Sequence, residues 1–201
     1  MAEEERLALL EIEHKFIVGD DFQLDPFLAR CESLEPLRRK QLDVRDCYYS
    51  LPGRRDIILR HRFDAELQQF TLKSRGRDSE IRDEINLGLL REPDQKTEIR
   101  AWTQLLGASE PHQIDKSIWV FEFPDCEVVY YEARYAAQGR EIQCVEIEAR
   151  GAATVKEALA TLERYEQLLG FQAAARSHAD LFSLLISDLI EGAELLREER
   201  A

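Results

Sequence analysis

The feature that most constrains the fold is a strand pattern with one apolar face and one face that carries charges of both signs. It is clearest in residues 11–18, Glu-Ile-Glu-His-Lys-Phe-Ile-Val, because alternate residues of a strand point to opposite sides. Glu11, Glu13 and Lys15 share one side, and His14 lies among apolar residues on the other. Carboxylates at this spacing can share a hard cation, and the ammonium beside them can hold an anion that the cation brings. A solvated outer strand explains the same pattern.

Seven further segments alternate in a similar way, some of them loosely, and are predicted to be strands. They are Arg38–Leu51, Asp56–Phe63, Gln69–Arg75, Glu80–Leu89, Gln113–Phe123, Glu127–Ala136 and Arg140–Arg150. Apolar residues at helical spacing predict helices over Phe22–Leu34, Pro93–Leu106, Thr154–Leu169 and Ser177–Arg200. The second helix is expected to bury Ile99, Trp102, Leu105 and Leu106, and the third begins with a Thr154/Glu157 capping box.

Bulk composition limits the class of protein. The 201 residues are 44% hydrophobic, which is enough for the core of a single domain. A formal net charge of -13 argues against a general nucleic-acid binder, which would present a basic face. The four cysteines are widely spaced and form no C-x-x-C pair, so we expect reduced thiols and no disulfide framework or zinc site.

The N-terminal residues Met-Ala-Glu-Glu-Glu-Arg are acidic and lack the apolar segment of a signal peptide. No apolar run approaches the length of a membrane-spanning helix. We therefore expect a cytoplasmic protein with no nucleic-acid partner and no membrane partner. The sequence leaves a homodimer open.

Two architectures are compatible with the predicted strands. An open sheet would pack its apolar face on the helices and show its charged face to water. A closed barrel would instead enclose the charged face, and acids, bases, a metal and an anionic ligand would have to neutralise one another there. Arginine and lysine dominate the middle strands, whereas paired glutamates lie on the first and last. If the barrel closed in sequence order, these two strands would be neighbours and an acidic corner would face a basic wall.

Several motifs occur in an order that resembles a known superfamily. Glu11-Ile-Glu13-His-Lys15 resembles the E-x-E-x-K signature of the CYTH, or triphosphate tunnel metalloenzyme, superfamily, which includes class IV adenylate cyclases and thiamine triphosphatases. Leu106-Gly107 followed by Lys116 is similar to a helix-then-basic-strand step of that superfamily. The remaining motifs follow in the same order, and they are Asp46-Cys-Tyr48-Tyr49, Arg60-His-Arg62, Phe70-Thr-Leu-Lys73, Arg82-Asp-Glu84 and Val145-Glu146-Ile-Glu148.

This resemblance implies an α+β fold, a closed antiparallel eight-stranded β-barrel (a tunnel) with flanking helices. A single CYTH-like domain would span residues 1–201, with barrel strands over about 8–150 and C-terminal helices over about 153–200. The implied cofactor is Mg²⁺ or Mn²⁺, held by the metal-binding residues Glu11, Glu13, Glu132, Glu146 and Glu148. The implied substrate ligands are Lys15, Arg60, Arg62, Lys73, Arg82 and Lys116, and the catalytic residues would be Glu84 and Lys15.

The chain departs from the superfamily pattern at three positions. Ser50 stands where an acid is common, and His14 stands where an arginine is frequent. Ile118 lies two residues after Lys116, at a place where a second basic residue is usual. The last departure removes one expected phosphate contact.

The resemblance implies divalent-metal-dependent hydrolysis of inorganic triphosphate or of a small organic triphosphate. The substrate would be tripolyphosphate, thiamine triphosphate or a nucleoside triphosphate. One alternative is a class IV-type adenylate cyclase that converts ATP to cyclic AMP and pyrophosphate. Another is a non-catalytic module that binds polyphosphate or a nucleotide. The sequence does not separate these activities, because the same basic residues would hold the phosphate chain in each.

Overall fold

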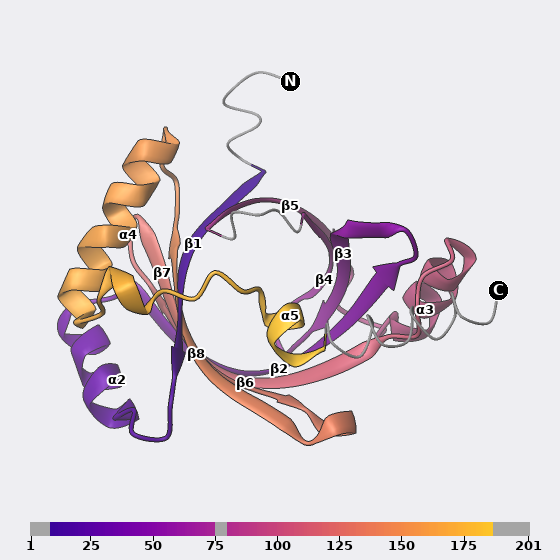
Figure 1. The fold of residues 1–201 in the computed structure, drawn as a ribbon, viewed down its shortest axis with the longest axis horizontal. Coiled ribbons are helices and arrows are strands. Elements are labelled where there is room, and N and C mark those ends of the chain that lie inside the picture. The colour runs from indigo at the N-terminus through magenta and orange to yellow at the C-terminus, as the bar shows by residue number, and fades with distance from the viewer. Residues whose placement is uncertain (1–8, 75–79, 187–201) are drawn as a thin grey trace.

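The computed structural model describes residues 9–74 and 80–186 of the chain. Eight antiparallel strands close into a barrel in the order β1-β5-β4-β3-β2-β6-β7-β8 (Figure 1). Their bounds are β1 Leu10–Val18, β2 Arg38–Leu51, β3 Arg54–Phe63, β4 Gln68–Ser74, β5 Ile81–Leu89, β6 His112–Glu122, β7 Cys126–Tyr135 and β8 Arg140–Ala149. The predicted closed eight-stranded barrel with flanking helices is therefore confirmed.

The barrel does not close in sequence order, which corrects one expectation from the sequence. The first and last strands are neighbours as predicted, with Glu13 opposite Glu148 and Lys15 opposite Glu146. However, the other neighbour of β1 is β5, so Glu11 lies opposite Arg82. Helix α2 (Leu24–Ser33) separates β1 from β2 in the chain, and β2 pairs with β3 and β6 instead.

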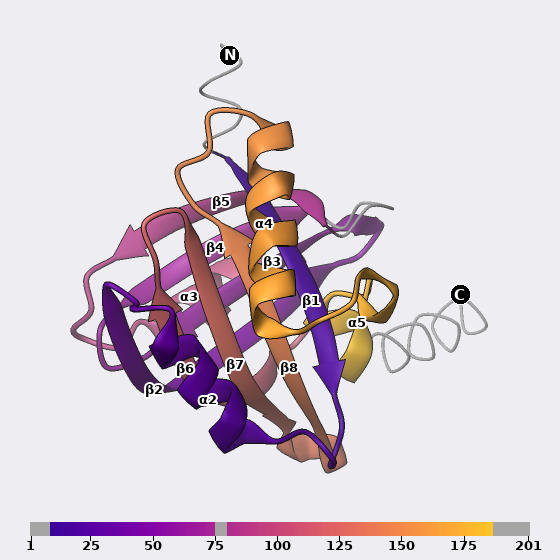
Figure 2. The ribbon, with the colours of Figure 1, turned by 90° about the vertical axis from the view of Figure 1, so that its left-hand side faces the viewer.

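The main apolar core lies outside the barrel. The outward side chains Ile12 and Phe16 of β1 and Ile147 of β8 pack with residues of α2 and α4 (Val155–Leu169). Figure 2 shows these two helices lying across the outer surface of β1, β7 and β8. Because alternate strand residues face opposite sides, this core directs Glu11, Glu13 and Lys15 into the barrel. The charged positions are thus fixed by packing on the opposite face.

Helix α4 begins and ends as its sequence predicts. The Thr154 hydroxyl accepts a hydrogen bond from the Glu157 backbone N–H at 3.1 Å, and a Glu157 carboxylate oxygen accepts one from the Ala153 N–H at 3.0 Å. Gly170 follows the helix with a φ of +84°, a backbone conformation that favours glycine. These caps fix the length of the helix that covers β1.

Helix α3 (Lys96–Leu105) contradicts the predicted buried stripe. Ile99 is 9% exposed, but Trp102, Leu105 and Leu106 are 52%, 88% and 54% exposed. The helix meets the barrel through Ile99 and Thr103, one turn apart, and Trp102 contacts Phe70 only edge-on at 5.5 Å between ring centroids. Successive helical residues turn by about 100°, so Leu105 points away from that contact.

Helix α5 (Leu181–Leu185) closes one end of the barrel. Its residues Leu181, Phe182 and Leu185 pack with inward-facing apolar residues such as Val44 and Ile114, and Figure 1 shows the helix at the mouth of the barrel. The predicted helix over Ser177–Arg200 is thus found only at Leu181–Leu185, and positions 187–200 of that prediction lie outside the described residues. No helix within 9–74 and 80–186 is both long and apolar enough to cross a membrane.

Candidate functional site

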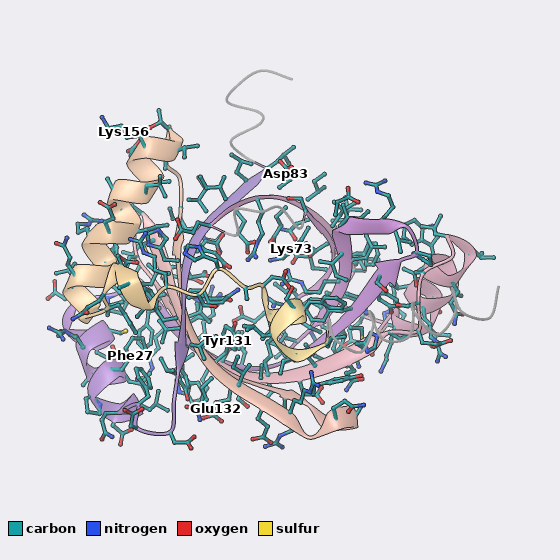
Figure 3. The ribbon with its side chains drawn as sticks, in the orientation of Figure 1. Phe27, Lys73, Asp83, Tyr131, Glu132 and Lys156 are labelled. Atoms are coloured by element: carbon teal, nitrogen blue, oxygen red, sulfur yellow. The ribbon has the colours of Figure 1, made fainter. Side chains whose placement is uncertain are left out.

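The barrel encloses a cavity of about 380 Å³ that strands and α5 line together. Every predicted site residue except Glu132 lines this one cavity, and the set comprises Glu11, Glu13, Lys15, Arg60, Arg62, Lys73, Arg82, Glu84, Lys116, Glu146 and Glu148. Figure 3 shows Lys73 and Tyr131 inside the barrel. Residues from β1, β3, β4, β5, β6 and β8 therefore converge on one interior, as the tunnel interpretation requires.

Glu132 is not brought into the cavity, which corrects its placement among the metal-binding residues. It is exposed on the outer side of β7, where its carboxylate accepts a hydrogen bond from the Tyr130 hydroxyl at 3.1 Å, and Figure 3 shows it outside the barrel wall. Alternation gives the reason, because Tyr131 faces the cavity and the next residue must face outward. The other four glutamates remain as candidates.

Acids and bases are interleaved on β1, β4 and β5 and are not separated into a corner and a wall. The Lys73 ammonium lies 2.8 Å from a Glu11 carboxylate oxygen and also pairs with Glu84. The Arg82 guanidinium pairs with Glu11 and Glu13. The expected segregation of charge is therefore wrong, because β5 borders the first residues of β1 and places Arg82 opposite Glu11, while the acidic strand β8 borders only the rest of β1.

Lys15 connects the carboxylates of β1 and β8. Its ammonium lies 3.2 Å from Glu13 and 3.1 Å from Glu146, and the Tyr131 hydroxyl donates to Glu146 at 2.8 Å. Burial opposes the charged form of Lys15, but these carboxylates outweigh burial and raise its pKa. Burial also acts to raise the pKa of Glu146, yet Lys15 and Lys116 lower it to about 2. Both groups are therefore charged at neutral pH.

Asp46 forms a second ion-pair centre that sequence analysis did not assign to the site. Its side chain is fully buried, receives two hydrogen bonds of 2.8 Å from Arg62, and lies 2.7 Å from the Lys116 ammonium. Burial favours a neutral carboxyl, but Arg62 and Lys116 outweigh it and hold the pKa of Asp46 well below its usual range. Two of the predicted phosphate ligands are thus held by an internal carboxylate.

Arg60 is the predicted phosphate ligand with the weakest internal partners. Its side chain is buried, with Nη2 3.3 Å from the Thr71 hydroxyl and 3.7 Å from a Glu84 oxygen. Its Nε has no hydrogen-bond partner within the described residues. Burying a guanidinium donor without a partner is unfavourable, so this group is suited to receive an anionic ligand.

Four carboxylates, those of Glu11, Glu13, Glu146 and Glu148, could hold a hard divalent cation. Burial and the neighbouring carboxylates raise the pKa of both Glu13 and Glu148, which indicates crowding of negative charge. Within the described ranges, no three His, Cys, Asp or Glu side chains are grouped as a ready metal site. The donor chemistry nevertheless fits Mg²⁺ or Mn²⁺, provided that the carboxylates exchange Arg82 and the lysines for the cation.

We expect Glu148→Gln to stabilise the metal-free protein by about 1 kcal/mol at pH 8. A carboxyl whose pKa is raised in the folded state lowers stability as the pH rises from below about 4.5 through that raised pKa. The variant avoids this loss, and Arg150 keeps Glu127 as a partner at 3.0 Å. Thermal unfolding with EDTA should show a higher Tm for the variant at pH 8 and no difference near pH 4. Glu141→Gln, at an exposed position of β8, serves as the matched control, and a lower Tm for Glu148→Gln at pH 8 would contradict the expectation.

Comparison with known proteins supports the fold. No family model matches the sequence, and no curated protein sequence matches it. The PH1012 protein from Pyrococcus horikoshii aligns with a TM-score of 0.70 and 19% identity, over 88% of this chain and 99% of that chain. A candidate adenylate cyclase from Bacillus halodurans aligns with a TM-score of 0.59 and 15% identity, over 88% of this chain and 97% of that chain.

A third solved structure with the same architecture belongs to a protein whose name states an activity. The RNA triphosphatase domain of the mimivirus mRNA capping enzyme aligns with a TM-score of 0.50 and 9% identity, over 85% of this chain and 99% of that domain. These alignments extend over nearly the whole of each relative. The fold implied by the CYTH resemblance is therefore confirmed, by the barrel itself and by solved structures that share it.

Proposed function

We propose that this chain, a barrel with the triphosphate tunnel fold, is a divalent-metal-dependent triphosphatase that releases orthophosphate from a triphosphate. The observation that carries the proposal is the convergence of six basic side chains and four candidate metal-binding carboxylates on one enclosed cavity. A triphosphate carries several negative charges, which arginine and lysine side chains bind through charge-assisted hydrogen bonds. Charged side chains that served only solubility would lie on the outer surface and would not line a cavity inside the barrel.

The basic residues would hold the phosphate chain. Arg60 offers a guanidinium whose Nε has no partner among the described residues and whose closest carboxylate contact is 3.7 Å long, so Nε is available to donate to a phosphate. Lys15 stays protonated because of Glu13 and Glu146, and a fixed ammonium can offset negative charge that grows on phosphate oxygens in the transition state. Glu84 pairs with Lys73 and thereby orients that side chain.

The proposed cofactor is Mg²⁺ or Mn²⁺, held by Glu11, Glu13, Glu146 and Glu148. When bound, such an ion would supply stabilisation of the negative charge on the phosphate chain and activation of a water molecule for hydrolysis. The chain's own contribution is to enclose the phosphate chain, to orient it with cations from several strands, and to limit the access of bulk water. The oxygen-only donor set does not suit structural zinc.

The decisive experiment is incubation with tripolyphosphate, thiamine triphosphate or ATP in the presence of Mg²⁺ or Mn²⁺. Release of orthophosphate supports the proposal. Cyclic AMP together with pyrophosphate would identify a cyclase, which is the activity that the name of the Bacillus halodurans protein suggests for that protein. Binding of these compounds without any product would identify a binding module, and either result would overturn the triphosphatase assignment.

We expect Arg60→Gln to raise the KM for the triphosphate by about 10-fold or more, because it removes a charge-assisted contact to phosphate. The Tm should change little, since the closest carboxylate oxygen to this guanidinium is 3.7 Å away. Arg54→Gln, at an exposed position of the same strand, is the matched control for the loss of an arginine. If Arg60→Gln keeps the wild-type KM and kcat, Arg60 does not contact the substrate.

A further inference from the structure

One part of the cavity wall is apolar. Leu42 of β2, Ile118 and Val120 of β6, and Val129 of β7 all line the cavity that contains the charged site. The strand register places Leu42 opposite Ile118 and Val120 opposite Val129, so the four side chains form one continuous surface. We call this surface the apolar wall.

The apolar wall occupies one arc of the barrel and is bordered by charged side chains. Strands β2, β6 and β7 are consecutive in the barrel order, and β8, β1, β5, β4 and β3 complete the circle. The four candidate metal-binding carboxylates lie on β1 and β8. Charged side chains border the wall closely, since Glu146 lies opposite Val129 and Lys40 lies opposite Val120. The cavity therefore combines a continuous apolar surface with charged groups along its edges.

The protein's own side chains do not cover the apolar wall completely. Helix α5 covers part of the inward apolar surface, where Phe182 contacts Tyr48 at 5.8 Å between ring centroids. Leu42 and Val129 remain only partly buried although both line the cavity. Apolar surface that remains accessible to solvent inside a cavity is suited to contact an apolar part of a ligand.

We infer that the ligand of this cavity is an organic polyphosphate ester, whose apolar or aromatic group lies on the apolar wall while its phosphate chain lies on the charged strands. This inference rests on the proposed function, and it narrows the substrate class by setting organic triphosphates above inorganic triphosphate. Inorganic tripolyphosphate has no apolar surface to cover the wall. Phosphate oxygens placed directly on the four apolar side chains would lose hydration, and those side chains offer no hydrogen bonds in return.

The test compares two ligands that are not hydrolysed, namely the bis-methylene analogues of ATP and of tripolyphosphate, by calorimetry with Mg²⁺. The organic analogue should bind about 10-fold more tightly or better, in line with what pocket contacts to one apolar group contribute. Equal affinities, or tighter binding of the inorganic analogue, would overturn the inference.

Ile118→Lys places a charge in the apolar wall next to Lys116. It should weaken binding of the organic analogue and strengthen binding of the inorganic analogue, so that the preference reverses or disappears. Ile118→Val keeps the wall apolar and should retain the wild-type preference. Val129→Thr is a milder polar change for use if Ile118→Lys fails to fold, and it should lower the affinity for the organic analogue alone by a few-fold. If the folded Ile118→Lys or Val129→Thr variant keeps the wild-type preference for the organic analogue, the inference is contradicted.

These affinities, together with the turnover assay of natural triphosphates, separate this inference from the proposed function. Preferential binding of the organic analogue, with no turnover of any natural triphosphate, would support the inference and contradict the triphosphatase assignment. Orthophosphate release together with equal affinities for the two analogues would support the triphosphatase assignment and contradict the inference. If neither analogue binds, both are wrong.

Discussion

Arg62→Ala is expected to destabilise the protein by about 3–5 kcal/mol, because it leaves a buried carboxylate without its main partner. Asp46 is fully buried and accepts two hydrogen bonds of 2.8 Å from Arg62. Lys116 alone, 2.7 Å from Asp46, would then have to neutralise that charge. Urea unfolding at pH 7 measures the loss directly.

The double variant Arg62→Ala with Asp46→Asn is the control for this prediction. It removes the buried charge together with its partner, so it should recover a large part of the lost stability. A single Arg62→Ala variant within 1 kcal/mol of wild type would show that Asp46 does not depend on Arg62. From sequence, Arg62 would be expected to act on substrate alone, without effect on the fold. The structure revises that expectation, and Arg60 is the better probe of phosphate binding.

Local periodicity predicted the inward residues well where one face of a strand is clearly apolar. In β1 the outward positions Ile12 and Phe16 pack on helices, so the inward position of Glu13 follows from alternation alone. In β7 both faces are apolar, since Val128 and Tyr130 face outward and Val129 and Tyr131 face inward. Alternation cannot choose a side in such a strand, and the placement of Glu132 was wrong for this reason.

Long-range pairing could not be derived from the sequence. The placement of Arg82 beside Glu11 depends on β5 lying next to β1, which no local pattern specifies. The role of Asp46 likewise depends on its register opposite Arg62. The alternation of strand residues would have placed Asp46 inward together with Tyr48, so the sequence held a weak indication of its position. The sequence held no such indication for Tyr131, because an inward tyrosine is equally typical of an apolar core.

Removal of divalent metal with excess EDTA is expected to reduce turnover by at least about a thousandfold while leaving the fold intact. The fold should persist because the main core lies outside the barrel, between β1, β7, β8 and the helices α2 and α4. Circular dichroism should therefore show little change in secondary structure. Added Mg²⁺ or Mn²⁺ should restore activity, and full turnover in excess chelator would contradict metal dependence.

The internal ion pairs add a second expectation, that metal and triphosphate raise each other's affinity. In the cavity the carboxylates are neutralised by the protein's own cations, since Arg82 pairs with Glu11 and Glu13, and Lys15 pairs with Glu13 and Glu146. If these carboxylates held a divalent cation, Arg82 and Lys15 would be free to bind phosphate, and if the basic groups held a phosphate chain, the carboxylates would be free to bind the cation. By reciprocity the coupling is the same in both directions. Calorimetry should therefore find that the tripolyphosphate analogue binds about 10-fold more weakly, or worse, in EDTA than in Mg²⁺. Equal affinity in both conditions would show that the carboxylates do not bind metal together with the substrate.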